Sequence, residues 1–302
     1  MLPGALNMSS PQPSTSSDFR LILRGIGCVL LAGLLITLSD AITKWLGGVY
    51  PVGQMLCARG AFFLLILSVV LLAFRKSRSV TVVSWPAHLL RGGLSTGSAF
   101  LFVTSLQYLP LADSITIAFA APLFITALAA RFLGEQVGRR RWTAVLIGFG
   151  GVALIMKPDG DTLHWAVLLP LGAAFFESVR DILTRRMTVT ESSLSMVIVS
   201  TAVVVLCAAV TSIGGWPAMS WTHAAVLAAA GLLFGSAHWL MAESLRLAQV
   251  VVVAPFRYSP VIWGLLLGVL IWSEFPDGFM LAGTTLVVGS GLYIFYRERQ
   301  RT

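Results

Sequence analysis

The pattern Asp-x-x-Thr followed by a cation occurs twice, at Asp40–Lys44 and at Asp181–Arg185, each time near the end of a long apolar segment. In both copies the carboxylate stands four residues before the cation, which is the favourable order for an ion pair along a helix. Such a pair contributes roughly 0.2–0.5 kcal/mol in water and becomes stronger when water is excluded. We therefore predict one gate element used twice. The alternative is an ordinary ion pair at each helix end.

Other polar residues lie deeper in the apolar segments, where a charge costs at least about 2.5–3.5 kcal/mol and needs a partner or a cavity. Glu177 and Asp181 share a helix face with Arg180 at its edge, and Glu243 is predicted to pair with Arg257 or to face a cavity. Pro255 and Pro260 bracket Arg257 and Tyr258, and prolines in such positions indicate a bent helix beside a cavity. The cavity candidates are Arg59, Ser98, Phe100, Phe102, Glu177, His238, Trp239, Glu243, Arg257 and Tyr258.

An enzyme embedded in the membrane is the competing class. Catalysis would need a nucleophile with its base, a metal cluster or a carboxylate pair supported by other groups. Glu177 and Asp181 have no supporting His or Lys, and the four histidines are scattered along the chain. We therefore expect no catalytic residue, no metal site and no cofactor.

The composition indicates a membrane protein with many spans, because mean hydropathy is +0.85 and only 11% of residues are charged, against about 25% in soluble domains. A bilayer core is crossed by a helix of roughly 20 apolar residues. The fold class is thus all-α, with ten predicted transmembrane helices near 21–43, 53–74, 87–107, 111–132, 141–156, 163–186, 193–214, 222–246, 250–273 and 277–296.

The cations predict the orientation, since cytoplasmic loops carry an excess of Lys and Arg. With both termini inside, fifteen of the 21 cations fall in cytoplasmic segments and only Lys44 and Lys157 lie opposite. We expect a multi-pass protein of the cell inner (plasma) membrane. The net charge of +8 then reflects topology rather than a nucleic-acid surface.

Short matches at an offset of 138 or 139 residues indicate an internal repeat. They include Gly97-Ser-Ala-Phe with Gly235-Ser-Ala-His, Pro122 with Pro260, and Glu135 with Glu274. The predicted division is a disordered tail at 1–20, five-helix repeats at 21–158 and 159–296, and a short tail at 297–302. Because five is odd, the second repeat is inverted, and inverted repeats are the architecture of secondary transporters that alternate access around a central site.

These features resemble the EamA-type members of the drug/metabolite transporter superfamily over roughly residues 21 to 296. The resemblance rests on Asp40-x-x-Thr43-Lys44, on Pro51, Gln54 and Arg59, on Leu109-Pro110-Leu111-Ala112, on Pro122, and on Gly134-Glu135-Gln136. The second half departs from this pattern, with Gln249-Val250 and Ser273-Glu274-Phe275 at the matching places. The resemblance implies a carrier of small molecules that works by alternating access.

The expected substrate is a small amphipathic or zwitterionic compound, because the predicted cavity mixes charges with aromatic rings and lacks the dense cations that a phosphate needs. Export of amino acids, including aromatic ones, is the first choice. Uptake of a vitamin or other metabolite is the alternative.

Small residues predict a close helix contact. Gly264 and Gly268 form a GxxxG pattern, and Thr126 and Ala130 occupy the matching positions in the first half. We expect these faces to meet within a monomer.

Overall fold

The computed structural model describes residues 16–73, 82–132, 138–155, 165–248 and 250–299, and every regular element in these ranges is a helix. The all-α prediction is confirmed. The first half contains α1 (Ser16–Leu46), α2 (Val52–Ala73), α3 (Trp85–Ser105), α4 (Leu111–Ala118), α5 (Ala121–Phe132) and α6 (Arg139–Ile155). The second half contains α7 (Leu168–Met187), α8 (Ser193–Val210), α9 (Trp221–Leu247), α10 (Val250–Val253), α11 (Ser259–Trp272) and α12 (Gly278–Arg299), with 3-10 turns at Trp165–Val167, Thr211–Gly214 and Ala254–Tyr258.

Two of the ten predicted helices are broken. The segment predicted at 111–132 forms α4 and α5, and the one at 250–273 forms α10, a 3-10 turn and α11. The breaks lie just before Pro122 and Pro260, the two prolines that match between the halves. Proline removes a helix donor and clashes with the preceding turn, so each break has a local cause. At the N-terminus, residues 16–20 of the predicted disordered tail are helical instead, because α1 begins at Ser16.

Seven segments of the described chain are long and apolar enough to cross a membrane. They are Arg20–Leu46, Val52–Leu72, Leu111–Leu128, Ser193–Gly214, Trp221–Leu247, Ala254–Trp272 and Gly278–Tyr296. Of the remaining helices, α6 has only 17 residues, while α3 and α7 carry several of the polar residues discussed below. Their polar content sets α3 and α7 apart from the seven more apolar segments.

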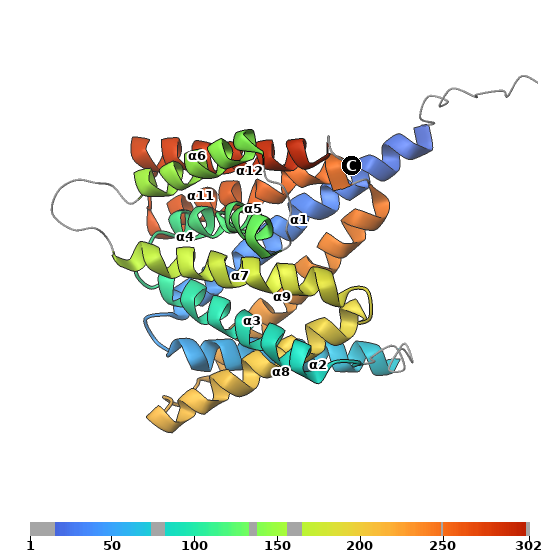
Figure 1. The fold of residues 1–302 in the computed structure, drawn as a ribbon. Helices are drawn as coiled ribbons and strands as arrows, with labels where there is room; N and C mark the ends of the chain where they lie inside the picture. The colour runs from blue at the N-terminus through green and yellow to red at the C-terminus, as the bar shows by residue number, and fades with distance from the viewer. Residues whose placement is uncertain (1–15, 74–81, 133–137, 156–164, 249, 300–302) are drawn as a thin grey trace, which may run out of the picture.

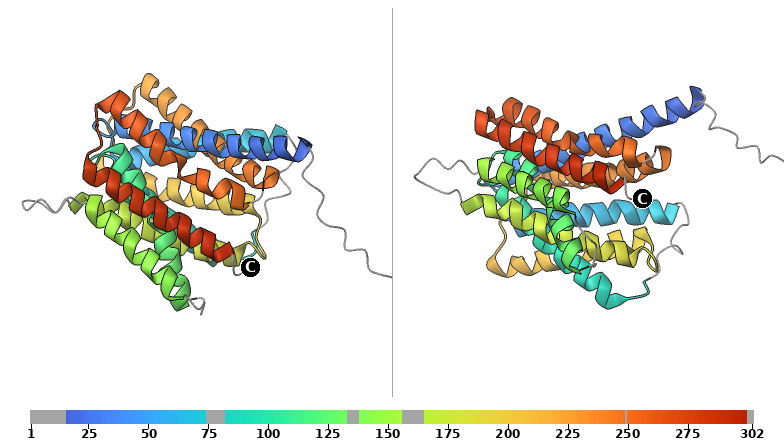
Figure 2. Two further views of the ribbon diagram at one scale, coloured as in Figure 1. Left: turned by 90° about the horizontal axis from the view of Figure 1, so that it is seen from above. Right: turned by 45° about the horizontal axis from the view of Figure 1, so that its top comes forward.

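Closely packed helices come in couples. α1 packs on α9 as α3 packs on α7, and α2 packs on α9 as α3 packs on α8. In the predicted repeats α1 corresponds to α7, α2 to α8 and α3 to α9. Replacing each helix by its counterpart therefore turns the first contact of each couple into the second. Three further contacts each join a helix to its own counterpart in the other repeat: α6 with α12, α2 with α8 and α4 with α11. α6 and α12 run side by side along one edge of the bundle (Figures 1 and 2).

The bundle has two ends, which we name after the residues that organise them. The start of α1 and the end of α12 lie at the same end of the bundle (Figure 1). That end also holds the connection from α7 to α8 and is called the Glu191 end. The opposite end, where α1 finishes, is called the Lys44 end.

The GxxxG glycines are used differently from the prediction. A Cβ at Gly264 would lie 2.9 Å from Ile115 Cδ1 and 3.4 Å from Ala112 Cα, so this glycine lets α11 approach α4. The hydroxyl of Thr126 donates to Pro122 O within its own helix at 2.9 Å. The predicted helices do meet, but through α4; the side chain of Ala130 lies outside the described residues.

The tightest helix contact joins α6 to α12. A Cβ at Gly151 would lie 2.7 Å from Gly283 O, and a Cβ at Gly283 would lie 2.5 Å from Gly151 O. Real Cβ atoms do not approach backbone oxygens this closely, so a side chain at either position must push the helices apart.

This geometry makes a prediction about stability. Gly283→Ala should lower the midpoint of thermal unfolding in detergent, because overpacking of this kind costs about 1–3 kcal/mol. Gly289→Ala, on the same helix with no atom within 4 Å of the added Cβ, is the matched control and should leave the midpoint unchanged or slightly higher. Equal midpoints for the two variants would contradict the observed α6–α12 contact.

Candidate functional site

Lys44, in the last turn of α1, joins three separate parts of the chain at the Lys44 end. Its Nζ lies 2.6 Å from Glu274 Oε1 in the α11–α12 connection and donates to Leu109 O before α4 at 2.7 Å. The ammonium also lies 5.3 Å from the ring centroid of Trp272. Its side chain is only 10% exposed, so it depends on these partners to offset the loss of water.

Glu274 completes this arrangement from the other side. Its second oxygen, Oε2, accepts from the backbone N–H of Leu111 at 3.0 Å, which caps the start of α4 where Pro110 offers no capping side chain. Ser273 holds a left-handed conformation (φ 55°), and Glu274 N donates to Gly268 O at 3.0 Å. A Cβ at Gly268 would lie 3.2 Å from Glu274 Oε2, so this glycine makes room for the carboxylate.

Asp40 takes Arg59 of α2 as its partner. Arg59 Nη1 lies 3.5 Å from both Asp40 Oδ1 and Thr43 Oγ1, and the guanidinium stands 4.8 Å from the ring centroid of Phe234 on α9. The predicted pairing of Asp40 with Lys44 is therefore wrong. The long Lys44 side chain reaches acceptors beyond its own helix, whereas Asp40 faces α2.

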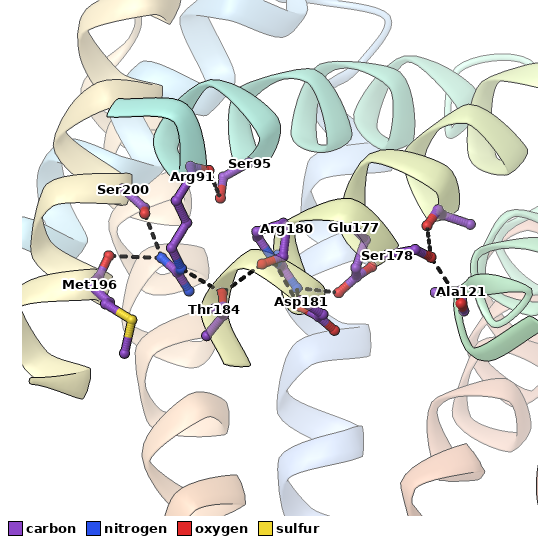
Figure 3. A network of polar contacts seen from close by, with 11 residues as sticks. Arg91, Ser95, Ala121, Glu177, Ser178, Arg180, Asp181, Thr184, Met196 and Ser200 are labelled. Atoms are coloured by element: carbon purple, nitrogen blue, oxygen red, sulfur yellow. Dashed lines mark hydrogen bonds and ion pairs between the residues drawn. The ribbon is translucent and has the colours of Figure 1, made fainter. Parts of the chain in front are cut away.

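The charged cluster on α7 is arranged as its spacing predicts (Figure 3). Arg180 Nη2 lies 2.7 Å from Glu177 Oε1 and 2.8 Å from Asp181 Oδ1. The carboxylates remain partly exposed, at 39% for Glu177 and 44% for Asp181. Asp181 contacts Arg180, its neighbour on α7, and the gate pair between Asp181 and Arg185 stays a prediction.

Arg91 of α3 was not among the predicted site residues. Its Nε donates to Thr184 Oγ1 at 2.8 Å, and its Nη1 donates to Met196 O at 2.8 Å and to the Ser200 hydroxyl (Figure 3). One guanidinium thus ties α3 to α7 and α8. The signal in the sequence was an arginine inside an apolar segment, which requires partners that the sequence does not identify.

His238 of α9 packs against Phe234, one turn earlier on the same helix. Its Nδ1 is 2.8 Å from Phe234 O, and the two rings stand 4.3 Å apart between centroids. The Arg59 guanidinium lies 4.8 Å from the centroid of the same Phe234 ring. His238 itself is exposed.

The other candidates divide into exposed and packed residues. Trp239 is 66% exposed and Arg257 is exposed, whereas Ser98 is buried. Glu243 Oε2 lies 3.2 Å from Arg246 Nη1 one turn along α9, so of the two alternatives for Glu243 the pair with Arg257 is not the contact observed.

Three aromatic candidates take part in packing. Phe100 and Phe102 each pack against a hydrophobic core cluster. The ring of Tyr258 lies 4.9 Å from that of Phe119, and its hydroxyl occupies the space that a Cβ at Gly291 would need. These rings support the site rather than line it.

Glu191, between α7 and α8, organises the Glu191 end. Its carboxylate accepts from the backbone N–H groups of Val83 at 3.1 Å and Ser84 at 2.7 Å, and Oε2 lies 3.0 Å from Nε2 of the buried His88. The His88 imidazole, followed by the two backbone donors, lowers the pKa of the Glu191 carboxyl below its ordinary value of 4.5.

A related contact exists at the Lys44 end. Tyr50, between α1 and α2, accepts from Ser220 N at 3.3 Å and lies 2.9 Å from Nδ1 of His223 at the start of α9. Each end therefore ties a helix connection to the first turn of a helix through a serine N–H and a histidine. Sequence spacing did not reveal either contact.

No group of three or more His, Cys, Asp or Glu residues is placed to hold a metal ion in the part of the chain that the structure describes. The chemistry of the site is that of ion pairs, hydrogen bonds and aromatic rings.

Comparison with known proteins identifies the class. Residues 23–157 match the EamA-like transporter family. The chain is 26% identical to an S-adenosylmethionine uptake transporter of Rickettsia felis, covering 92% of this chain and 94% of that protein. It is 28% identical to a riboflavin transporter of Rhizobium johnstonii (90% and 91% covered) and 23% identical to the pseudopaline exporter CntI of Pseudomonas aeruginosa (89% and 94% covered).

One solved crystal structure shares the fold, with a TM-score of 0.62 at 19% identity over 94% of this chain and 99% of that one. The chain is similar to the EamA-like transporter family over residues 23–157 and to metabolite transporters over about nine-tenths of its length. It is a multi-pass membrane transporter of small metabolites and not an enzyme.

The contacts of Lys44 make a prediction about access. Glu274→Gln should raise the rate at which an impermeant thiol reagent, applied from the Lys44 side, labels a Trp239→Cys reporter in a protein freed of Cys28, Cys57 and Cys207. We expect the labelling rate to rise about tenfold or more, since a hydrogen bond to a charged group contributes about 1.5–3 kcal/mol. Glu243→Gln, whose partner Arg246 is exposed, is the control and should not change the rate. A lower melting temperature with unchanged labelling would mean a purely structural ion pair.

The pKa of Glu191 predicts a dependence of stability on pH. Because folding lowers this pKa, the carboxylate stabilises the protein fully above about pH 4.5, and this contribution is lost as the pH falls through the folded-state pKa. The melting temperature of Glu191→Gln should therefore lie below that of the wild type by a constant amount between about pH 6 and 8, and the gap should close in acid. A gap that persists at about pH 3 would rule out the carboxylate charge as its cause.

Proposed function

We propose that this protein is an uptake carrier for a metabolite of the vitamin or nucleoside type, located in the cell inner membrane with both termini in the cytoplasm. The observation that carries the proposal is the match, over about nine-tenths of both lengths, to proteins named as S-adenosylmethionine uptake and riboflavin transporters. None of the three relatives described above is named as an amino-acid exporter. The alternative that the sequence left open is thus better supported than amino-acid export.

Alternating access between two inverted five-helix repeats, 21–158 and 159–296, is the mechanism we propose. Two features support it. The packed helix pairs exchange under the predicted repeat relationship, and the broken helices α4–α5 and α10–α11 carry the matched prolines. Discontinuous helices at equivalent places of two repeats are where secondary transporters bind their substrates. The substrate-binding residues we propose are Arg59 on α2, Arg180 on α7 and His238 on α9.

The two ends supply gates of different composition. At the Lys44 end, one ammonium holds Glu274 and a backbone carbonyl together, so opening must separate α1 from the α3–α4 and α11–α12 connections. Toward the other end, Arg180 with Glu177 and Asp181 forms a cluster on one helix that stays partly exposed. The contacts at the Lys44 end join separate parts of the chain, whereas the α7 cluster lies within one helix. This difference supports a conformation that is closed at the Lys44 end.

The proposal is tested with purified protein in liposomes. Labelled S-adenosylmethionine and labelled riboflavin should each be offered to vesicles preloaded with the same unlabelled compound. We expect saturable exchange of at least one of them, absent from empty vesicles and weakened by Arg59→Ala. Exchange of amino acids alone would contradict metabolite uptake and restore the export hypothesis. No exchange of any of these compounds by folded protein would reject the proposed substrate class.

A further inference from the structure

Asp40 on α1 is a buried carboxylate with little support from donors. Its side chain is 11% exposed, as is that of Arg59, whose Nη1 lies 3.5 Å from Asp40 Oδ1. A hydrogen bond between a cation and a carboxylate is usually about 2.7–2.9 Å long. The same Nη1 is shared with Thr43 Oγ1, also at 3.5 Å, and the Thr43 hydroxyl donates to Ser39 O instead of to Asp40. Within the described ranges, Arg59 is thus the only donor to this carboxylate.

Other carboxylates of the carrier have more donors or more water. The side chain of Glu191 is only 1% exposed, but it accepts from two backbone N–H groups and lies 3.0 Å from an imidazole nitrogen. Glu274 lies 2.6 Å from an ammonium and accepts from a backbone N–H at 3.0 Å. Asp181, which matches Asp40 in the second predicted repeat, lies 2.8 Å from a guanidinium and is 44% exposed. Among these four, only Asp40 combines burial with a single long contact.

Helix α9 passes beside this ion pair without adding a charge to it. A Cβ at Gly231 on α9 would lie 2.7 Å from Arg59 O, so the two helices are close at this level. The first titratable residues of α9 in either direction are His223 and His238. They are seven residues or more from Gly231, which is roughly 10 Å along a helix. Neither forms a hydrogen bond or an ion pair with Asp40.

The other elements packed on α1 also leave the pair alone. α10 and α11 contain no titratable residue. Within the described ranges, no hydrogen bond or ion pair joins Asp40 to the remaining titratable groups around it, which are Lys44 on α1, His88 and Arg91 on α3, Asp113 on α4, and Arg257 and Tyr258 in the 3-10 turn. The charge at this position therefore depends on Asp40 and Arg59.

This isolation has a consequence for protonation. A buried ion pair that loses one partner leaves an uncompensated charge, which is strongly unfavourable. A carboxylate avoids this by taking a proton and becoming neutral. A substrate acceptor that draws the Arg59 guanidinium away from Asp40 therefore favours protonation of Asp40. By the same linkage, a proton on Asp40 frees Arg59 for the substrate.

We propose that Asp40 is the proton-binding residue of the carrier, and that one proton and one substrate molecule are carried together. The proton comes from water on the side to which the site is open, and a substrate acceptor replaces Asp40 as the partner of Arg59. On the other side the substrate leaves, the proton returns to water and the ion pair forms again. This inference rests on the proposed function, because it uses Arg59 as a substrate-binding residue.

The experiment uses purified protein in liposomes with the membrane potential clamped at zero. Labelled riboflavin is the first probe, because it is uncharged near neutral pH, and labelled S-adenosylmethionine is the second. Acid outside should drive accumulation of up to about tenfold for each pH unit, since one coupled proton contributes a factor of about ten. Asp40→Asn should exchange the probe between equal concentrations but should not accumulate it.

The matched control is Asp277→Asn, the same change at the start of α12. An asparagine can accept from Met280 N as Asp277 does, so this variant should accumulate the probe like the wild type. Accumulation that persists in Asp40→Asn would overturn the inference and leave metabolite uptake intact. A wild type that exchanges the probe but ignores the pH gradient would do the same.

A second measurement does not depend on the substrate. If neither probe is exchanged, the proposed substrate class fails, and infrared spectroscopy of the protein in an ester-free detergent tests the proton site by itself. The spectrum of Arg59→Leu at neutral pH should contain the carbonyl stretch of a protonated carboxyl. The double variant Asp40→Asn with Arg59→Leu should lack it. Identical spectra in this region would overturn the assignment of the proton to Asp40.

Discussion

The ammonium of Lys44 is the interaction on which the geometry of one end of the carrier depends. A lysine that is 10% exposed must find acceptors for its hydrogens, and here they come from Leu109 O and Glu274. Glu274 in turn caps α4, and its position needs the left-handed Ser273 and a residue without a side chain at Gly268. The end of α1, the start of α4 and the α11–α12 connection are therefore held as one unit. Loss of this single charge would leave the α3–α4 and α11–α12 connections without their common partner on α1.

The two ends of the bundle are held by similar contacts that different side chains make. At each end a helix connection is tied to the first turn of a helix by a serine N–H and a histidine, through Tyr50 in one case and Glu191 in the other. Glu191 brings a charge and Tyr50 does not, so the strength of only one contact depends directly on a carboxylate. A carrier that alternates between two shapes needs such contacts to be comparable in free energy, because a large imbalance would hold it in one state.

Hydropathy predicted the helical segments well, because it acts locally and apolar segments of about 20 residues identify spans wherever they occur. A bend beside Pro255 and Pro260 was expected, but 111–132 was predicted as one helix and is interrupted before Pro122. The α7 cluster was predicted for the same reason, since Glu177, Arg180 and Asp181 lie within one turn. The partners of Lys44 and Arg59 could not be predicted, because spacing along one helix shows only neighbours in that helix. Glu274 is 230 residues from Lys44 in sequence, and only the packed fold brings the two together.

The central claim is that the Lys44 end is closed by a contact that opens during transport. The most direct test is the distance between spin labels at Val49 and Phe275, two exposed positions on the α1–α2 and α11–α12 connections, measured in lipid with and without saturating substrate. We predict one short distance in the wild type without substrate and a second, longer distance when substrate is present, with the longer one already populated in Glu274→Gln. A single unchanged distance under all three conditions would contradict the account.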